Sequence, residues 1–386
     1  MKSNTWAKNI LDTLKREAML VVAIVAAFVV VCVIRPSADI LKTIDWRTLG
    51  TLFLMLTVLE GFKKENIFNP ILRLAGKIKS CVGLAIFLVF GVFFTSMFVT
   101  NDVSLIIFVP LTIFLFRAAK KEKYILPLLA MENIAAIRGS LLTPFGSPQN
   151  LFIFGQSGVS VWSFVGYMSP IWAISGVVLL AFVVLLFAKN VKQKTDIPLS
   201  AIPAESLEDN TPKRLTYLFL FLIIIWMIVS RFEGWYFVAA MILVTIVIFD
   251  PKVLAKTDYA LIITFFCFFV FSSSISSNEG VANFLSRLVD GREYWVSILV
   301  SQVISNVPAG VVLYPFAVNK GALLYGLDSA GLCTIIGSLA SVINLRIYIR
   351  EYPGKGMKFI AVFEIVSLAF FALMVAPGYF LSLRAL

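Results

Sequence analysis

The sequence predicts an all-α polytopic membrane protein that is built as an inverted repeat. Of its 386 residues, 60% are hydrophobic and 14% are charged, a composition too apolar for a water-soluble domain. Apolar runs of roughly 15 to 24 residues recur along the chain, and these are long enough to cross a bilayer as helices. A polar interruption of one apolar run, at residues 100–102, also has a second copy at residues 305–306. These observations predict about nine transmembrane crossings, two re-entrant hairpins and two discontinuous helices.

The same composition excludes several function classes. The chain has no histidine, which removes histidine metal sites, Ser-His-Asp triads and histidine proton relays. Its four cysteines lie inside or at the edge of apolar runs without paired spacing, as small buried hydrophobic side chains do. The formal net charge of +11 arises from basic residues in short loops, where they orient a membrane protein. We therefore expect no enzyme activity, no organic cofactor and no nucleic-acid partner.

Polar segments and apolar runs divide the chain into six parts. These are an N-terminal helix with the first transmembrane span (1–44), a first repeat with a hairpin at 81–116 and a broken helix at 124–157 (45–188), a cytoplasmic linker (189–213), linking spans (214–257), a second repeat with a hairpin at 295–318 and a broken helix at 322–347 (258–350), and a last span (351–386). The first apolar run ends at Arg35-Pro36 without a small-residue cleavage pattern, so we expect a retained helix. Amphipathic stretches at 66–80 and 278–293 are typical of helices that lie at the membrane interface.

Each repeat combines a hairpin with a broken helix. Both flanks of 81–116 are basic, so this unit enters and leaves on the same side; a re-entrant hairpin fits this pattern, and two short full crossings are the alternative. The segment 124–157 contains Thr143-Pro-Phe-Gly-Ser-Pro-Gln-Asn150, whose prolines and glycine cannot continue a helix. With a cytoplasmic N-terminus, most Lys and Arg residues fall in cytoplasmic segments, as the positive-inside rule requires. We expect a multi-pass protein of the cell membrane in that orientation.

The two repeats correspond at their polar residues. Thr100-Asn101 matches Ser305-Asn306, and Thr143-x-x-Gly146-Ser147 matches Thr334-x-x-Gly337-Ser338. An odd number of predicted crossings separates the two repeats, so the second copy is inverted relative to the first. Inverted repeats with paired broken helices are the architecture of secondary transporters, whose binding site lies near mid-membrane.

These residue types suit the joint binding of a cation and an anion. Unwound backbone at 143–148 and 334–338 exposes carbonyl oxygens that can replace the hydration shell of Na⁺. The half-helices that start after Asp102 and Asn306 direct the positive ends of their dipoles at the centre, which favours an anion there. Asp102 would hold the coupling cation; capping of the helix that follows it is the alternative. Arg138 either pairs with Asp102 or Glu132 or contacts an anionic substrate.

Two motifs resemble the ion-transporter superfamily: Phe98-Val-Thr-Asn-Asp-Val-Ser-Leu-Ile-Ile-Phe-Val-Pro110 and Leu142-Thr-Pro-Phe-Gly-Ser-Pro-Gln-Asn150. This superfamily includes divalent-anion/sodium symporters, citrate-transporter-like permeases, arsenite permeases and NhaD-type sodium/proton antiporters. From residue 45 to residue 350 the chain most resembles small bacterial anion permeases with a citrate-transporter-like domain. The resemblance implies a scaffold domain that dimerises and a transport domain that crosses the membrane as an elevator.

The resemblance also implies two oxygen-rich sites, one at each hairpin tip and its neighbouring helix break. The first consists of Thr100, Asn101, Thr143, Gly146, Ser147 and Asn150, and the second of Ser305, Asn306, Thr334, Gly337 and Ser338. Two positions depart from the symporter pattern. Asp102 stands where the symporter motif has a neutral Thr, and Val307-Pro308 removes the hydroxyl from the second tip.

We therefore expect a secondary transporter that couples Na⁺ or H⁺, with Na⁺ favoured, to symport of a small anion such as a di- or tricarboxylate or an inorganic oxyanion. The expected cation ligands are Thr100, Asn101, Asp102, Thr143, Gly146, Ser147, Thr334 and Gly337. The expected substrate contacts are Asn101, Asn150, Ser305, Asn306, Ser338 and Arg138. A Na⁺/H⁺ antiporter or arsenite-type oxyanion extruder, in which Asp102 binds cation and proton alternately, is the first alternative, and a non-transporting membrane receptor is the second. The expected partners are the anion, the cation, the lipid bilayer and a second copy of the chain.

Overall fold

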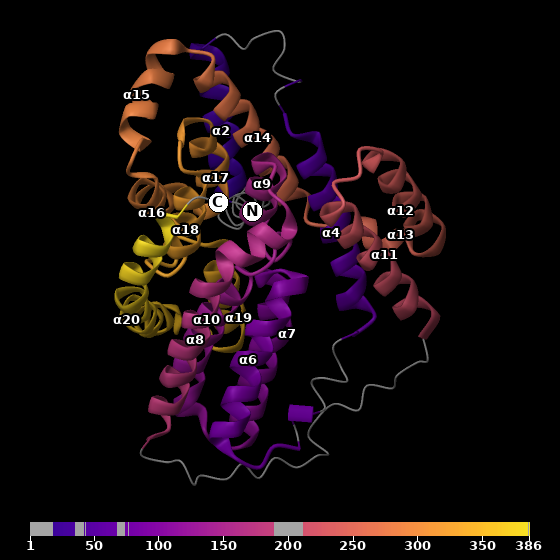
Figure 1. Ribbon diagram of the computed structural model, residues 1–386. Helices are drawn as coiled ribbons and strands as arrows, with labels where there is room; N and C mark the ends of the chain where they lie inside the picture. The colour runs from indigo at the N-terminus through magenta and orange to yellow at the C-terminus, as the bar shows by residue number, and fades with distance from the viewer. Residues whose placement is uncertain are drawn as a thin grey trace, which may run out of the picture.

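The described part of the protein is a bundle of helices. The computed structural model describes residues 18–34, 42, 44–67, 74–75, 77–188, 211–384 and 386, and its secondary-structure elements there are all helices (Figure 1). Six are long and apolar enough to cross a membrane: α6 (Cys81–Val99), α7 (Asn101–Ala118), α10 (Val161–Leu186), α11 (Thr211–Val229), α14 (Tyr259–Ser276) and α20 (Gly356–Ser382). Three shorter apolar helices are α2 (Ala18–Val33), α12 (Trp235–Phe249) and α16 (Glu293–Ile304). The predicted class, an all-α polytopic membrane protein, is confirmed, whereas the number of crossings and the inverted repeat stay predictions.

Several predicted features fall wholly or mostly outside the described residues. These are the polar start of segment 1–44, the centre of the amphipathic stretch at 66–80 and the linker 189–213 up to residue 210. The second amphipathic stretch is described, and it forms α15 (Glu279–Val289), with Asn278 as its N-cap.

Two pairs of helices are each joined by a single non-helical residue. Thr100 joins α6 to α7, and Ser305 joins α16 to α17 (Asn306–Leu313). Thr100 has φ 72° and ψ 154°, and Ser305 has φ 68° and ψ 158°. Residues other than glycine avoid this region, at a cost of about 1–3 kcal/mol. In Figure 1, α6 and α7 lie side by side in the lower half of the molecule, and α16 and α17 lie in the upper half.

Each of these pairs is followed by a helix that is interrupted. The first interruption separates α8 (Ile125–Gly139) from α9 (Pro148–Ser157), and the second separates α18 (Lys320–Ala330) from α19 (Leu339–Glu351). The same turn occurs in both: the Gly146 N–H donates to the Thr143 carbonyl at 3.3 Å, and the Gly337 N–H donates to the Thr334 carbonyl at 3.0 Å. Ser147 and Ser338 then lead into α9 and α19 with extended backbones.

Glycines allow each hairpin to pack tightly on its interrupted helix. A Cβ atom on Gly139 of α8 would lie 1.9 Å from the carbonyl oxygen of Phe93 on α6. In the second half, a Cβ atom on Gly326 of α18 would lie 2.3 Å from the carbonyl oxygen of Tyr294 on α16. Only a residue without a side chain permits such backbone contact, which is the way membrane helices approach most closely.

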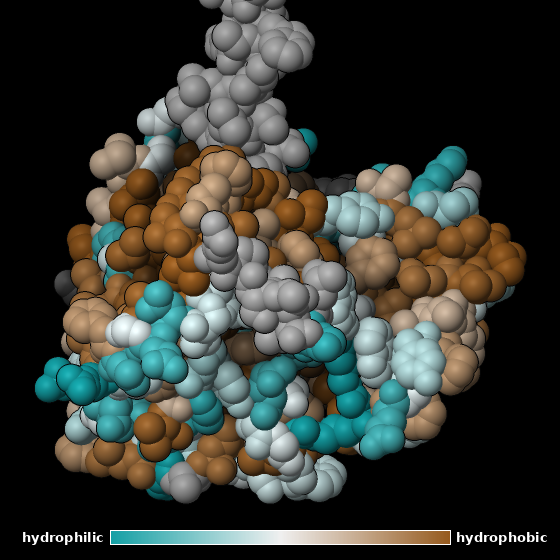
Figure 2. All heavy atoms as spheres, turned by 90° about the horizontal axis from the view of Figure 1, so that it is seen from above, coloured by the Kyte–Doolittle hydropathy of each residue, from teal (hydrophilic) through white to brown (hydrophobic). Residues whose placement is uncertain are grey.

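The outer helices present large apolar side chains to their surroundings, as contact with lipid tails requires. Phe28 on α2, Val177 on α10, Phe237 and Ile248 on α12 and Phe380 on α20 are 68–79% exposed. Figure 2, seen from above, shows hydrophobic side chains on the lobe at the right that α11 and α12 form and over the upper middle of the view, whereas hydrophilic side chains gather in its lower part and reach the left edge.

Hydrogen bonds and an ion pair hold the lobe of α11 and α12 against α4 (Trp46–Lys64). Lys64 Nζ donates to both carboxylate oxygens of Asp250 at 2.6 and 2.5 Å, and Tyr217 Oη donates to the same carboxylate at 3.0 Å. Burial favours the protonated form of Asp250, but the bonds from Lys64 and Tyr217 together lower its pKa below the ordinary value. The carboxylate is therefore held in its charged form at neutral pH.

Candidate functional site

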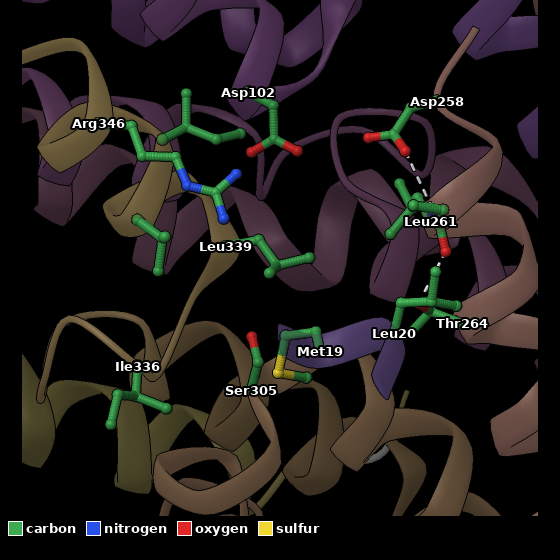
Figure 3. A pocket seen from close by; sticks show the side chains of 13 residues that line it. Met19, Leu20, Asp102, Asp258, Leu261, Thr264, Ser305, Ile336, Leu339 and Arg346 are labelled. Atoms are coloured by element: carbon green, nitrogen blue, oxygen red, sulfur yellow. Dashed lines mark hydrogen bonds between the residues drawn. The ribbon is translucent and has the colours of Figure 1, made fainter. Parts of the chain in front are cut away.

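A cavity of about 300 Å³ lies where the two hairpin tips approach each other. Asp102, at the start of α7, and Ser305, at the junction of α16 and α17, both line it (Figure 3). The other lining residues come from α2, α14 and the second interrupted helix: Met19, Leu20, Asp258, Ala260, Leu261, Thr264, Ile336, Leu339, Val342, Ile343 and Arg346. The two polar tips that the sequence predicts to face each other thus share one cavity.

Three charged side chains of the described residues line this cavity. Figure 3 shows them along one side of it, with the carboxylate of Asp102 between the guanidinium of Arg346 and the carboxylate of Asp258, and Ser305 opposite. Asp258 caps α14, because its Oδ1 accepts a bond from the Leu261 N–H at 3.0 Å. Asp102 lies in the first turn of α7, where the helix dipole stabilises a negative charge. Its buried Oδ1 nevertheless has no hydrogen-bond partner among the described residues.

Buried oxygens without partners also occur at the first interruption. Thr143 Oγ1 donates to the Met97 carbonyl, which fixes the unwound segment to α6. Asn150 Nδ2 donates to the carbonyls of Ser140 and Leu141 at 3.4 and 3.5 Å, so its Oδ1 is directed elsewhere. Within the described part of the chain, this Oδ1 and Ser147 Oγ have no hydrogen-bond partner.

The second interruption has a comparable arrangement. The Asn306 N–H donates to the Gly337 carbonyl at 3.1 Å, which ties the second tip to the second interruption. Thr334 Oγ1 donates its proton to Gln302 Oε1 at 2.7 Å, and the lone pairs of this hydroxyl oxygen can still accept. Ser305 Oγ and Asn306 Oδ1 are buried and find no partner in the described residues, and Ser338 is 2% exposed.

These unpartnered oxygens are the chemically informative feature of the site. A buried polar atom without a partner costs about 1–3 kcal/mol, so each of these oxygens is a candidate to contact a bound ligand. The described residues contain no cluster of three His, Cys, Asp or Glu side chains that could hold a transition metal. Neutral oxygens with one carboxylate instead suit a hard monovalent cation such as Na⁺.

Arg138 lies away from this cavity. It is 1% exposed in α8 and has no hydrogen bond to its Nε or Nη2 among the described residues. Its charged and polar neighbours come from the second half of the chain, with Tyr294 and Asp328 foremost. Glu132, a pairing partner considered from the sequence, accepts a bond from Thr112 Oγ1 instead.

Three polar residues of interest were not predicted from the sequence. Arg346 and Asp258 line the cavity although neither stands in a motif; the sequence places Asp258 at the start of a span and Arg346 within the predicted broken helix 322–347. Asp328 is 1% exposed and accepts a bond from Gln149 Nε2 at 3.1 Å, which links the two interrupted helices. The position of Arg346 inside a predicted crossing is a signal that could have identified it, whereas no local sequence signal marks Asp258 and Asp328.

Comparison with known proteins gives evidence about this chain that does not depend on the geometry of the cavity. The sequence model of a family described as "Citrate transporter" matches residues 10–333. The Inner membrane protein YbiR of Escherichia coli (strain K12) is 28% identical over 314 residues, which cover 78% of this chain and 80% of that protein. The Uncharacterized transporter MJ0456 of Methanocaldococcus jannaschii is 28% identical over 312 residues, which cover 80% of this chain and 83% of that protein.

Proposed function

The chain belongs to the citrate transporter family, and from this premise we propose that it is a secondary transporter that couples a cation to the movement of a small anion. The family, the relatives and the apolar helices indicate a multi-pass membrane transporter of anions. We propose in addition how transport is coupled and by what movement it occurs.

Cation coupling is supported above all by the unpartnered oxygens of the two tips and the first interruption. Asp102 Oδ1, Ser147 Oγ and Asn150 Oδ1 belong to the first half, and Ser305 Oγ and Asn306 Oδ1 to the second. A Na⁺ ion near Asp102 would satisfy oxygens that otherwise remain desolvated, and its charge would compensate the carboxylate. Only the first tip carries a carboxylate, so we assign the principal cation site to the first half.

Anion binding is supported by two features of the same cavity. Arg346 brings a guanidinium, which donates in a fixed geometry that matches a carboxylate. The N-termini of α7 and α17 begin at the two tips, and their partial positive charges favour an anion between them. Cation and anion would then cross together with most of their charge cancelled.

We propose an inverted repeat and an elevator-type movement on two grounds: the resemblance of the sequence to the ion-transporter superfamily, and the matching geometry of the two halves. The tips at Thr100 and Ser305 share one strained backbone conformation, and both interruptions contain the same glycine turn. These matches support an inverted repeat with an elevator-type movement of the site across the membrane. We further propose a homodimer in the cell membrane with a cytoplasmic N-terminus.

The test of this proposal is an uptake assay with Asp102→Asn in proteoliposomes. A sodium symporter should lose apparent sodium affinity yet recover anion uptake at higher sodium, because the neutral oxygens remain. Asp290→Asn, an exposed acid at the end of α15, is the matched control and should behave as the wild type. Sodium-independent uptake by the wild-type protein would contradict sodium coupling.

The second candidate function is a Na⁺/H⁺ antiporter or an oxyanion extruder. It is favoured by the single ionisable group at the first tip, because Asp102 could exchange a cation for a proton. In that case Asp102→Asn should abolish pH-driven exchange outright, and no concentration of sodium should restore it. The two functions are therefore separated by one variant.

A further inference from the structure

The lining of the cavity between the tips indicates a narrower substrate class than a family name does. Among the described residues, eight of the thirteen that line the cavity have apolar side chains: Met19, Leu20, Ala260, Leu261, Ile336, Leu339, Val342 and Ile343. Sites that bind a highly charged molecule surround it with donors, whereas apolar walls with one or two polar groups bind an apolar body with a polar end. This cavity is of the second kind, with apolar walls and few polar groups.

The charges of the lining limit the charge of the ligand. Among the described residues that line the cavity, Arg346 is the one cationic side chain, and Asp102 and Asp258 are the two anionic ones. A single coupling cation makes this set electrically neutral before the ligand binds, so a monoanion leaves one negative charge uncompensated and each further carboxylate adds another. A guanidinium can pair with one carboxylate in a bidentate manner. Further carboxylates on the same ligand would face aliphatic side chains or the two aspartates, and burying an unpaired charge there is strongly unfavourable.

From these observations we propose that the cavity binds a singly charged organic anion with an apolar body, such as a short-chain or aromatic monocarboxylate, in preference to a tricarboxylate. The carboxylate pairs with Arg346, and the apolar body lies against Leu339 (Figure 3) and against Val342 and Ile343, which follow it on α19 and also line the cavity. The inference deepens the proposed anion transport and rests on it. The volume of about 300 Å³ is at the small end of ligand cavities, which limits the size of the body.

The test measures binding to the purified full-length protein in lipid nanodiscs with sodium present. The probes are acetate, butyrate, hexanoate and benzoate, compared with succinate, citrate and sulfate, and empty nanodiscs give the background partitioning. We expect affinity to rise by about fourfold for each added methylene, the effect of burying one CH₂ group, until the cavity is full. Val342→Thr, which keeps the side-chain volume and adds a hydroxyl, should weaken hexanoate binding more than acetate binding.

The guanidinium is tested by Arg346→Gln. It should weaken binding of the monocarboxylates by roughly 10- to 100-fold, as loss of a charge-assisted hydrogen bond does, and should leave binding of the neutral hexanamide unchanged. Arg350→Gln is the matched control, because Arg350 lies one turn further along α19 and does not line the cavity. An equal loss in both variants would overturn the assignment to Arg346.

Separate outcomes bear on the substrate class and on transport itself. Tighter binding of citrate, succinate or sulfate than of hexanoate, or affinity that does not depend on chain length, would refute the monocarboxylate preference. Sodium-driven citrate uptake would then still uphold the proposed transport. Tight binding of hexanoate without sodium-dependent flux of any of these anions would refute the transport function while leaving the binding preference in place.

Discussion

Glycine at position 305 should stabilise the protein more than alanine does, which reverses the usual order. In most helices and loops, alanine is more stable than glycine by about 0.5–1 kcal/mol, because glycine loses more backbone entropy on folding. Ser305 has φ 68° and ψ 158°, a conformation that is almost confined to glycine. Alanine there retains a strain of about 1–3 kcal/mol, which glycine does not have. The difference between these two effects makes the free energy of unfolding of Ser305→Gly higher than that of Ser305→Ala by about 1 kcal/mol.

The comparison of two variants removes the contribution of the hydroxyl group, which both lack. Thermal unfolding in one detergent, at one protein concentration and with sodium present, gives the order of the two melting temperatures. Ser301, which is buried within α16, is the matched control, and there Ala should exceed Gly in stability by about 1 kcal/mol. The same reversal is expected at Thr100, whose φ is 72°. If Ser305→Ala is as stable as Ser305→Gly, the tip is unstrained and the reasoning is wrong.

Two further predictions follow from contacts at other positions. Gly139→Ala should prevent accumulation of folded protein in the membrane, because the added Cβ would lie 1.9 Å from a backbone oxygen. Gly166→Ala is the control and should be tolerated, because no atom lies within 4 Å of its Cβ. Size-exclusion profiles of the two purified variants provide the comparison. Asp250→Asn should cost about 2 kcal/mol at pH 7, because Lys64 loses its carboxylate partner. Because the folded pKa of Asp250 is lowered, its contribution to stability is fully present above the unfolded pKa of about 4 and is lost as the pH falls through the lower folded pKa. The advantage of the wild type over Asp250→Asn should therefore shrink progressively below about pH 4 in unfolding experiments, and an advantage that does not shrink with falling pH would contradict the assignment.

The sequence contains the local features of the fold in recognisable form. Helix-incompatible residues mark the first interruption, since Pro144, Gly146 and Pro148 lie within it or at its end, and α8 ends at Gly139. The polar residues at 100 and 305 likewise lie where two helices meet. Boundaries are less predictable: the second arm of the second hairpin ends as a helix at Leu313, because Pro315 initiates a 3₁₀ turn there.

The cavity itself could not have been predicted in this way. Met19, Asp258 and Arg346 lie in three separate parts of the sequence, and only the packing of α2, α14 and α19 brings them together. Apolar residues such as Leu339 have the same appearance in a sequence whether they face lipid, the core or a ligand. Periodicity identifies helices, but it does not identify which helix faces will surround the same space.

The close contact at Gly139 has a mechanical consequence for ion selectivity. Because backbone atoms of α6 and α8 touch there, and those of α16 and α18 touch at Gly326, neither hairpin can slide along its interrupted helix without a collision. The spacing between the oxygens of each tip and those of the adjacent interruption is therefore set by rigid backbone contact. At the proposed Na⁺ site, oxygens held at a rigid spacing would not adapt to a smaller or a larger ion. We expect Li⁺ and K⁺ to replace Na⁺ poorly for this reason, whatever anion accompanies them.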